Sequence, residues 1–362
     1  MLVFLAILIA VAFFIEVKSI NEALKGIDYT YTCSQPLVEP DETLEVITTI
    51  SNKSSRFVPF IRLDELLPEE ANVLSKSARI RRDEKGAQRH LSSVYMMPRS
   101  KLERRLTISF SRRGRYLFRG ARVTGGDFMG LSDEMKQFFV LQEVVVYPKA
   151  AKVDDLLSIL GGFFGDMSVR RFIMEDPVLT IGAREYTGRE PLKQISWTHS
   201  ARANRLMVKQ FDYTIDPFVT VMLDVNTKSA GEVREQVLER CFSITRSVCQ
   251  LLEDKGIPYD FITNATTGNT ISSWSYKGEG LGRWHFFSIL EGLGRATYDS
   301  TESFQSTIEK MKKHQTGNRS TIIILPERNA EKEKMVQRLQ ESGKGSAKLI
   351  YGEDIDDIYS RD

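Results

Sequence analysis

The run FVTVMLDV at residues 218–225 is almost entirely apolar, which is typical of a strand buried on both faces of a parallel sheet. The segment 232–252 that follows repeats apolar residues at helical spacing. Further strand-like runs, STIIIL at 320–325 and AKLIYG at 347–352, alternate with helical patterns. This alternation predicts a doubly wound α/β domain over residues 218–362.

Polar residues follow the first of these strands at the edge where doubly wound sheets bind ligands. Asp224, Asn226 and Thr227 offer oxygen ligands of the kind that a hard cation such as Mg²⁺ prefers. The segment DVNTK is similar to the D-x-S-x-S that opens the metal site of von Willebrand factor type A domains. Here Lys228 replaces the second serine, and residues 326–328 (PER) follow STIIIL without an aspartate ligand. We therefore expect a degenerate site without metal, in which Asp224 caps its loop by hydrogen bonding.

The preceding part of the chain, residues 28–149, has the two-residue period of half-buried strands. ETLEVITTISN places Leu44, Val46, Thr48 and Ile50 on one face. Turn-forming clusters such as SNKSS and TGGD separate the strand-like runs. These features predict an antiparallel β-sandwich of immunoglobulin-like type over residues 21–150. Residues 151–217 are interpreted as a connector followed by a separate motif.

The N-terminal fifteen residues carry no charge before Glu16. As a helix they would span about 22 Å, against a hydrocarbon core of about 30 Å, and extension to Ile20 brings the run near the required length. A buried core helix is the alternative. We expect residues 1–20 to form a single-pass anchor in the cell membrane. Lys18 and Lys25 after the run then place the rest of the chain in the cytoplasm.

Charge is unevenly distributed along the chain. The net charge is only +2, which argues against a surface built for nucleic acid. The segment 78–115 nevertheless holds twelve basic residues against three acidic ones. The basic residues are Arg79, Arg81, Arg82, Lys85, Arg89, Arg99, Lys101, Arg104, Arg105, Arg112, Arg113 and Arg115. They could decorate solvent-facing strand positions, or they could bind a polyanion or an anionic membrane.

Known catalytic patterns are absent from the sequence. The four histidines are scattered, and none is in H-x-x-x-H or H-E-x-x-H spacing. The three cysteines have no C-x-x-C spacing, and Cys241 and Cys249 fall on the apolar side of a predicted helix, where they should be core residues. We therefore expect neither an enzyme nor a bound cofactor.

A basic and aromatic motif, REYTGREPLKQISWTHSARANRLMVKQFD, occupies residues 184–212. Its residue types alone favour clamping of acidic groups within the fold over an exposed binding site. The residues that give the motif its order and spacing are Arg184, Tyr186, Glu190, Lys193, Trp197, Ser200 and Arg202.

This spacing resembles the signature R-E-Y-x-P-G-D-x-x-R-x-I-D-W-x-x-S-A-R of the domain-of-unknown-function 58 family. This sequence departs from the signature at a few positions. Gly188 and Arg189 replace its Pro-Gly pair, Glu190 replaces the first Asp, Lys193 replaces the Arg, and Ser196 replaces the Asp before the Trp. RGRY, GDFMGL and VVVYP upstream look like further landmarks of that family. The resemblance implies a membrane protein with a von Willebrand factor type A-like C-terminal domain.

The resemblance also implies a class of partner, because members of that family commonly accompany MoxR-type AAA+ ATPases and transglutaminase-like membrane proteins. We therefore expect a membrane-anchored adaptor that binds an AAA+ ATPase or a membrane complex and no nucleic acid. In this hypothesis, the signature joins the two domains, with Arg184 and Arg202 paired to carboxylates or carbonyls and Trp197 buried in the seam. One alternative is a metal-dependent enzyme or a ligand-binding site at the carboxyl edge of the α/β sheet, around Asp224. The other is a polyanion or anionic-membrane binding protein.

Overall fold

The computed structural model describes residues 24–354 with several gaps. The gaps are 84–85, 127–132, 152–155, 157–158, 165–179, 189, 212–217, 268–273, 315–318 and 342–345. The chain forms two compact units, Met1–Lys149 with Leu293–Arg295, and Ala150–Gly292 with Ala296–Asp362. The predicted boundary at residue 150 lies beside this division.

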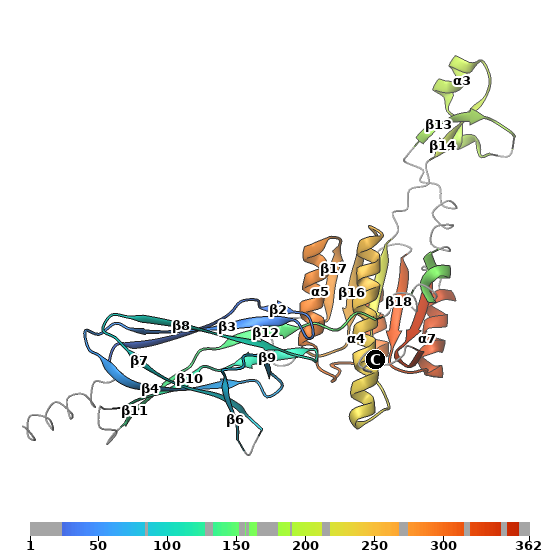
Figure 1. Ribbon diagram of the computed structural model, residues 1–362. Helices are drawn as coiled ribbons and strands as arrows, with labels where there is room; N and C mark the ends of the chain where they lie inside the picture. Colours follow the sequence, from blue (N-terminus) through green and yellow to red (C-terminus); the bar gives the residue numbers. More distant parts are fainter. Residues whose placement is uncertain are drawn as a thin grey trace, which may run out of the picture. The chain divides into compact units, whose positions relative to one another are not determined.

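The first unit contains a β-sandwich of mainly antiparallel strands (Figure 1). One sheet has the order β1 (Ile27–Cys33), β3 (Thr43–Asn52), β8 (Lys101–Ser109), β5 (Asn72–Val73). The second has the order β11 (Asp133–Phe138), β10 (Ala121–Gly126), β4 (Val58–Leu67), β7 (Gln88–Met96), β6 (Arg79–Arg82). A third contains β2 (Leu37–Val38), β12 (Gln142–Val146) and β9 (Gly114–Phe118). β2 pairs with β12 in parallel, and the other pairs of these sheets are antiparallel.

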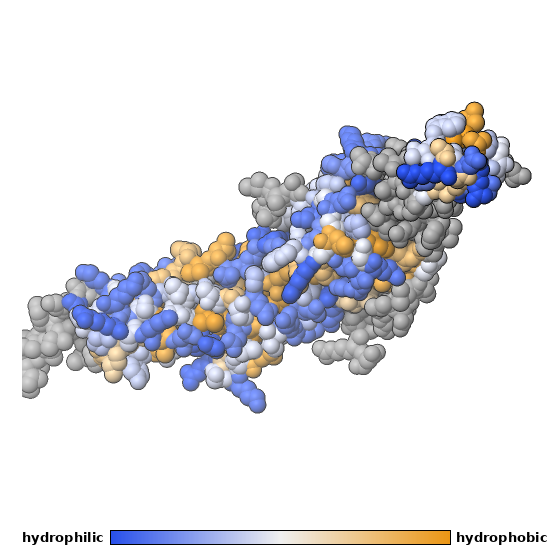
Figure 2. Space-filling model, turned by 90° about the horizontal axis from the view of Figure 1, so that it is seen from above, coloured by the Kyte–Doolittle hydropathy of each residue, from blue (hydrophilic) through white to orange (hydrophobic). Residues whose placement is uncertain are grey.

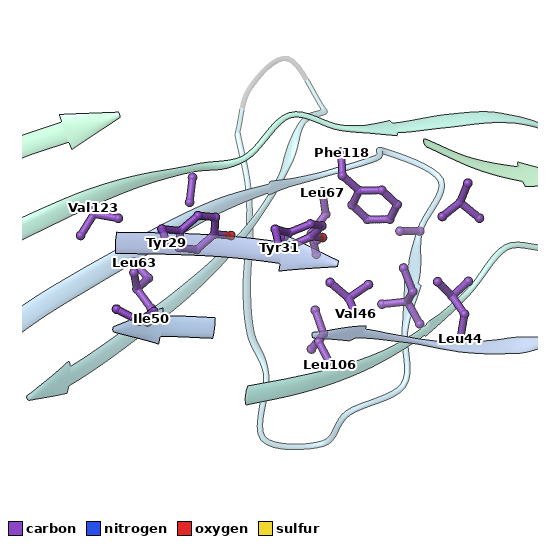
Figure 3. Close-up of a cluster of buried hydrophobic side chains, with 14 of the residues drawn as sticks. Tyr29, Tyr31, Leu44, Val46, Ile50, Leu63, Leu67, Leu106, Phe118 and Val123 are labelled. Atoms are coloured by element: carbon purple, nitrogen blue, oxygen red, sulfur yellow. The ribbon is translucent and has the colours of Figure 1, made fainter. Parts of the chain in front are cut away.

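The sandwich core follows the two-residue period of its strands. The predicted inward face of β3 is confirmed, since Leu44, Val46, Thr48 and Ile50 are all buried. Figure 3 shows Ile50 of β3 in one core with Leu63 of β4, so the core takes side chains from both large sheets. Burial of alternate residues is what stabilises strands of this kind.

The second unit contains a five-stranded sheet in the order β17-β16-β15-β18-β19. Its strands are β15 (Val219–Leu223), β16 (Tyr259–Thr263), β17 (Tyr276–Gly280), β18 (Ser320–Leu325) and β19 (Ala347–Tyr351), all parallel except β17. The described helices after β15 are α4 (Gly231–Asp254), α5 (Arg283–Arg295), α6 (Phe304–His314) and α7 (Ala330–Glu341). The predicted α/β alternation is therefore present.

Helices cover both faces of this sheet. Met222 and Ile323 pack with α6 and α7 in one core cluster, whereas α4 contacts β15 and β18 and belongs to no part of that cluster. All five residues of β15 are buried, as the apolar run predicted. Cys241 and Cys249 are buried on α4, which confirms their predicted place in the core.

The order of the strands creates a switch point in the middle of the sheet. From β15 the chain passes to β16 on one side, and later to β18 on the other. In open α/β sheets, the crevice beyond the carboxyl ends of the two strands at such a point is where ligands bind. The residues after β15 and β18 are therefore the first to consider as a site.

The predicted membrane anchor at residues 1–20 lies outside the described residues, which begin at Leu24. Across the described part of the chain, no helix has both the length and the apolar character needed to cross a membrane.

Candidate functional site

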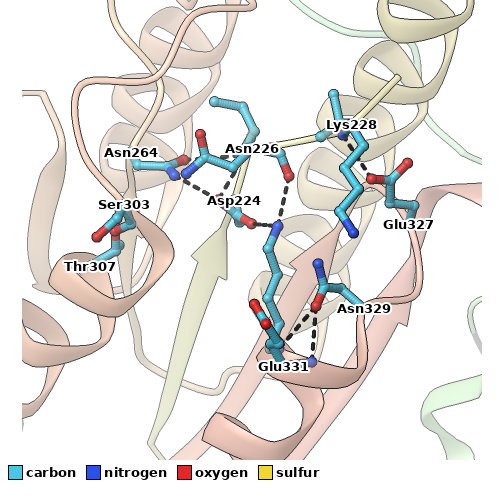
Figure 4. Close-up of polar contacts among 12 residues, drawn as sticks. Asp224, Asn226, Lys228, Asn264, Ser303, Thr307, Glu327, Asn329 and Glu331 are labelled. Carbon is cyan, nitrogen blue, oxygen red and sulfur yellow. Dashed lines mark hydrogen bonds and ion pairs between the residues drawn. The ribbon is translucent and has the colours of Figure 1, made fainter. Parts of the chain in front are cut away.

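The carboxylate of Asp224 is the centre of a polar cluster at the switch point (Figure 4). Asp224 follows β15 directly, and its backbone N–H donates to the carbonyl of Ile324 in β18 (3.0 Å), which fixes it between the two strands. The residue is fully buried. Its Oδ1 accepts hydrogen bonds from the Asn264 side chain (2.6 Å) and the Asn226 backbone (3.2 Å). The predicted capping of the loop by Asp224 is confirmed.

The second oxygen of Asp224 is paired with a lysine from a distant part of the chain. The ammonium of Lys332 lies 2.5 Å from Oδ2 of Asp224 and 2.6 Å from the backbone oxygen of Asn226. Only 13% of the Lys332 side chain is exposed. The ammonium therefore supplies the positive charge that the buried carboxylate requires.

Lys332 reaches this position from the first turn of α7. Asn329 caps that helix, because its Oδ1 accepts from the backbone N–H groups of Glu331 (2.9 Å) and Lys332 (3.4 Å). A cation at the N-terminus of a helix is disfavoured by the helix dipole. The contact with Asp224 offsets this cost, so the position of Lys332 depends on that carboxylate.

Two asparagines complete the cluster. Asn264 follows β16, and its Oδ1 accepts from the backbone of Val225 (2.9 Å). The side-chain amides of Asn226 and Asn264 donate to the carbonyl of Glu302, at 3.0 and 3.3 Å. The loops after β15 and β16 and the segment before α6 are thus held together by uncharged donors.

Lys228 does not have the role that the sequence predicted. Its ammonium was expected at the place of the second serine of D-x-S-x-S, but the cation beside Asp224 is Lys332. The backbone N–H of Lys228 instead donates to Glu327 (2.8 Å), which also accepts from Ser229 (3.2 Å). Burial raises the pKa of Glu327, but the hydrogen bonds from Lys228, Thr227 and Ser229 outweigh it and lower the pKa below its usual value.

These residues do not fit a divalent cation. Mg²⁺ binds about 2.0–2.1 Å from its oxygen ligands and needs six of them. A cation bound at Oδ2 of Asp224 would meet the Lys332 ammonium, which already lies 2.5 Å from that oxygen. Like charges at such a distance repel strongly in a buried site.

The buried cysteines are unsuited to nucleophilic catalysis. Burial raises the pKa of the Cys241 and Cys249 thiols, and the charge of Asp224 raises that of Cys241 further. A thiol must ionise to become a nucleophile. Both therefore remain protonated at neutral pH.

The signature motif forms a separate hairpin. β13 (Thr180–Glu185) pairs with β14 (Met207–Phe211), and the 3-10 helix η1 (Leu192–Gln194) and α3 (Trp197–Ala203) lie in the connection between the two strands. Ser200 ties α3 to β14, since its hydroxyl donates to the Ser196 carbonyl (2.9 Å) and accepts from the backbone of Met207 (2.8 Å). The Tyr186 backbone N–H donates to the carbonyl of Leu206 (2.9 Å).

Arg184 pairs with a carboxylate, as the sequence predicted. Its Nη1 lies 2.6 Å from Oε1 of Glu190. Glu190 also accepts from the backbone N–H (3.1 Å) and hydroxyl (2.8 Å) of Thr187. Partial burial raises the pKa of Glu190, but the hydrogen bonds from Thr187 and Arg184 outweigh it and bring the pKa down to about 2.

Two predictions about the signature are wrong. Trp197 was expected to be buried, but 68% of it is exposed. Arg202 was expected to pair with a carboxylate or a carbonyl, but it is exposed and makes no such contact with a described residue. Lys193 is also exposed. The motif therefore uses Arg184, Glu190 and Ser200 to hold itself together and leaves Lys193, Trp197 and Arg202 at the surface, with Tyr186 half-buried.

Comparisons with known proteins identify no family. No protein-family model matches the chain, and no curated protein matches it. Among solved structures, a cohesin module of a Clostridium perfringens family 33 glycoside hydrolase is 14% identical over 33% of this chain and 96% of its own, with a TM-score of 0.24. A CARDB domain from Pyrococcus furiosus, in complex with di-metal ions, is 14% identical over 34% and 90%, with a TM-score of 0.23. Likenesses at this level carry no argument about function.

Proposed function

We propose that this chain is a membrane-anchored adaptor that binds a protein partner through the signature hairpin and has no catalytic activity of its own. The partner expected from the family resemblance is a MoxR-type AAA+ ATPase, and residues 1–20 provide the anchor. In this proposal the sandwich is immunoglobulin-like, and the α/β unit is a von Willebrand factor type A-like domain whose metal has been replaced by Lys332.

The observation that carries the proposal is the exposed apolar and basic face of the hairpin. Leu192, Trp197 and Leu206 are exposed at 71%, 68% and 45%, and Lys193 and Arg202 are exposed as well. Figure 2 shows hydrophobic and strongly hydrophilic residues side by side on this segment. Trp and Arg are the residue types that most often dominate the binding energy of protein interfaces. Because the hairpin is held together by its own hydrogen bonds, these exposed side chains are available to bind a protein partner.

The switch point supports the same conclusion from another direction. A metal-dependent enzyme at Asp224 would need the carboxylate to be free for a cation. The Lys332 ammonium forms an ion pair with that carboxylate instead. Because this ion pair takes the carboxylate that a metal would need, it weighs against a metal-dependent enzyme at Asp224.

The test uses the full-length chain, cross-linked and captured from its own membranes, with mass spectrometry of the recovered proteins. Trp197→Ala is compared with Trp284→Ala, because Trp284 is exposed at 89% in the same unit but lies outside the hairpin. We expect an AAA+ ATPase to be recovered with the native chain and with Trp284→Ala, and lost with Trp197→Ala at unchanged melting temperature. Equal recovery with Trp197→Ala, or no AAA+ ATPase with the native chain, would overturn the proposal.

A further inference from the structure

The β-sandwich contains a cavity of about 710 Å³ that the proposed function does not use. Its walls come from β4, β6 and β7 of one sheet, from β8 of the other, and from residues 75–78, which connect the strands β5 and β6. The lining residues are Arg62, Asp64, Ser75, Ser77, Ala78, Arg79, Arg81, His90, Leu91, Ser92, Ser93, Arg104, Arg105 and Leu106. The volume is within the range of about 300–1,000 Å³ that is usual for small-molecule sites.

The charge of this lining is strongly positive. It has five arginines and a single carboxylate, Asp64. Of these arginines, Arg105 pairs with Glu45 (3.4 Å) and Glu103 (3.2 Å), which lie outside the lining. Both oxygens of Asp64 already accept from Arg89 Nη1, at 3.2 and 3.1 Å. Arg79 and Arg81 form no ion pair with a described residue. Guanidinium groups gathered around one space repel one another unless an anion enters it.

The floor of the cavity is preorganised. Arg104 donates to the buried carboxylate of Glu65 and to the hydroxyl of Ser92. Glu65 also accepts from Thr48 (2.6 Å) and contacts Nδ1 of His90 (2.9 Å). Burial raises the pKa of Glu65, but the hydrogen bond with His90 and the charge of Arg104 outweigh it, so the pKa lies below its usual value. Glu65 is therefore charged at neutral pH and holds Arg104 in place.

A donor at this floor has no acceptor. Nε of Arg104 is buried and has no hydrogen-bond partner among the described residues. That atom has no accessible surface, so it does not face the cavity; the part of the Arg104 side chain that stays exposed, 25%, can still meet a ligand. The four serines of the lining can supply further donors.

The residue types of the lining favour a phosphate group over single-stranded nucleic acid. Arginine is the residue that binds phosphate through two parallel hydrogen bonds, and serine hydroxyls donate to the same oxygens. Single-stranded nucleic acid is bound on aromatic side chains that stack with its bases. Among the described lining residues there is no Phe, Tyr or Trp.

We propose that this cavity binds a phosphate group, carried either by a small soluble molecule or by a lipid headgroup, with Arg79, Arg81 and Arg104 as its principal donors. The inference is independent of the proposed adaptor function, because it concerns a different unit. Charged residues on an edge strand such as β6 also prevent aggregation, but that role predicts no ligand.

The test compares neighbouring arginines of one strand. Arg79 and Arg81 line the cavity, whereas Arg82, also exposed on β6, does not. The double variant Arg79→Gln/Arg81→Gln is therefore matched with Arg82→Gln/Arg122→Gln, which removes the same charge at exposed positions outside the lining. In the first arm, the full-length chain in neutral detergent is titrated with inorganic phosphate by calorimetry. In the second, the chain in phosphatidylcholine nanodiscs is floated with phosphatidylcholine vesicles that contain or lack phosphatidic acid.

We expect binding in at least one arm, reduced about tenfold or more in Arg79→Gln/Arg81→Gln and within about twofold of the native value in the control. Binding of free phosphate assigns the site to soluble ligands, and flotation with phosphatidic acid alone assigns it to a lipid headgroup. Absence of binding in both arms overturns the proposal. An equal loss in both double variants also overturns it, because general surface charge would then explain the binding.

Discussion

The ammonium of Lys332 and the carboxylate of Asp224 form a buried ion pair, with 2.5 Å between Nζ and Oδ2. The two residues are more than one hundred positions apart in the chain, and their contact fixes the start of α7 to the end of β15. Removal of either partner leaves the other charge without compensation.

Lys332→Met should lower the free energy of unfolding by about 3–5 kcal/mol, because it leaves Asp224 charged and buried without a counter-ion. Chemical denaturation measures the loss. Lys334→Met is the matched control, since Lys334 is exposed on the same helix and should change stability by no more than about 0.5 kcal/mol. Asp224→Asn added to Lys332→Met should restore part of the stability. Equal effects of the two lysine variants would show that the pair contributes nothing.

Glu65 should make the sandwich sensitive to acid. Its pKa in the folded state lies below the usual value of 4.5. Its contribution to stability is therefore present above that value and is lost as the pH falls through the lower, folded-state pKa. Glu65→Gln should cost about 3 kcal/mol at pH 7 and should flatten the fall in stability below about pH 4.5. Urea unfolding across the pH range tests this. Glu103→Gln, at a more exposed carboxylate of β8, should leave the pH profile unchanged.

Gly292→Ala should destabilise α5, although alanine is the better helix former by about 1 kcal/mol. A Cβ at Gly292 would overlap the indole ring of Trp274 at Cε2, so the ring would have to move. We expect a loss of about 3 kcal/mol from this overpacking. Gly162→Ala places its Cβ in open space and should be neutral or stabilising. Thermal melting of both variants decides between propensity and packing.

Ser200→Ala should loosen the signature hairpin without affecting the parallel sheet. The hydroxyl links α3 with the backbone of Met207, and loss of these hydrogen bonds should cost about 1–2 kcal/mol. Amide hydrogen exchange should become faster at Met207 and remain unchanged in β15. Unchanged exchange at Met207 would show that the hydroxyl is dispensable.

Trp197→Ala should change the free energy of unfolding by less than about 1 kcal/mol, because the side chain is mostly exposed. Burial in a seam between domains would instead have predicted a loss of several kcal/mol. Chemical denaturation of the variant distinguishes the two. A large loss would show that Trp197 is packed in the folded protein.

The elements that local periodicity determines could be predicted from the sequence. The inward face of β3 and the fully buried β15 follow from side-chain alternation and from an unbroken apolar run, both of which are properties of neighbouring residues. Asn264 was also within reach, since it directly follows the strand-like run PYDFIT at residues 258–263, at the same edge as Asp224.

The cation of the site could not be predicted, because it comes from a distant helix. Lys332 stands in a segment rich in charges of both signs, where any lysine could face solvent. Its only local signal is an unfavourable place in the first turn of a helix. Burial of Trp197 was predicted from the hypothesis that the signature joins the two domains, but burial depends on which surfaces meet, and periodicity does not determine that.

A cation that is covalently part of the chain cannot dissociate. A site that holds Mg²⁺ or Ca²⁺ changes its charge and shape with the concentration of the ion and can be emptied by a chelator. The Lys332 ammonium, in contrast, is a side chain of the protein, so every folded molecule has one at this position. Chelators and changes in divalent ion concentration should therefore leave this edge of the sheet in a single state.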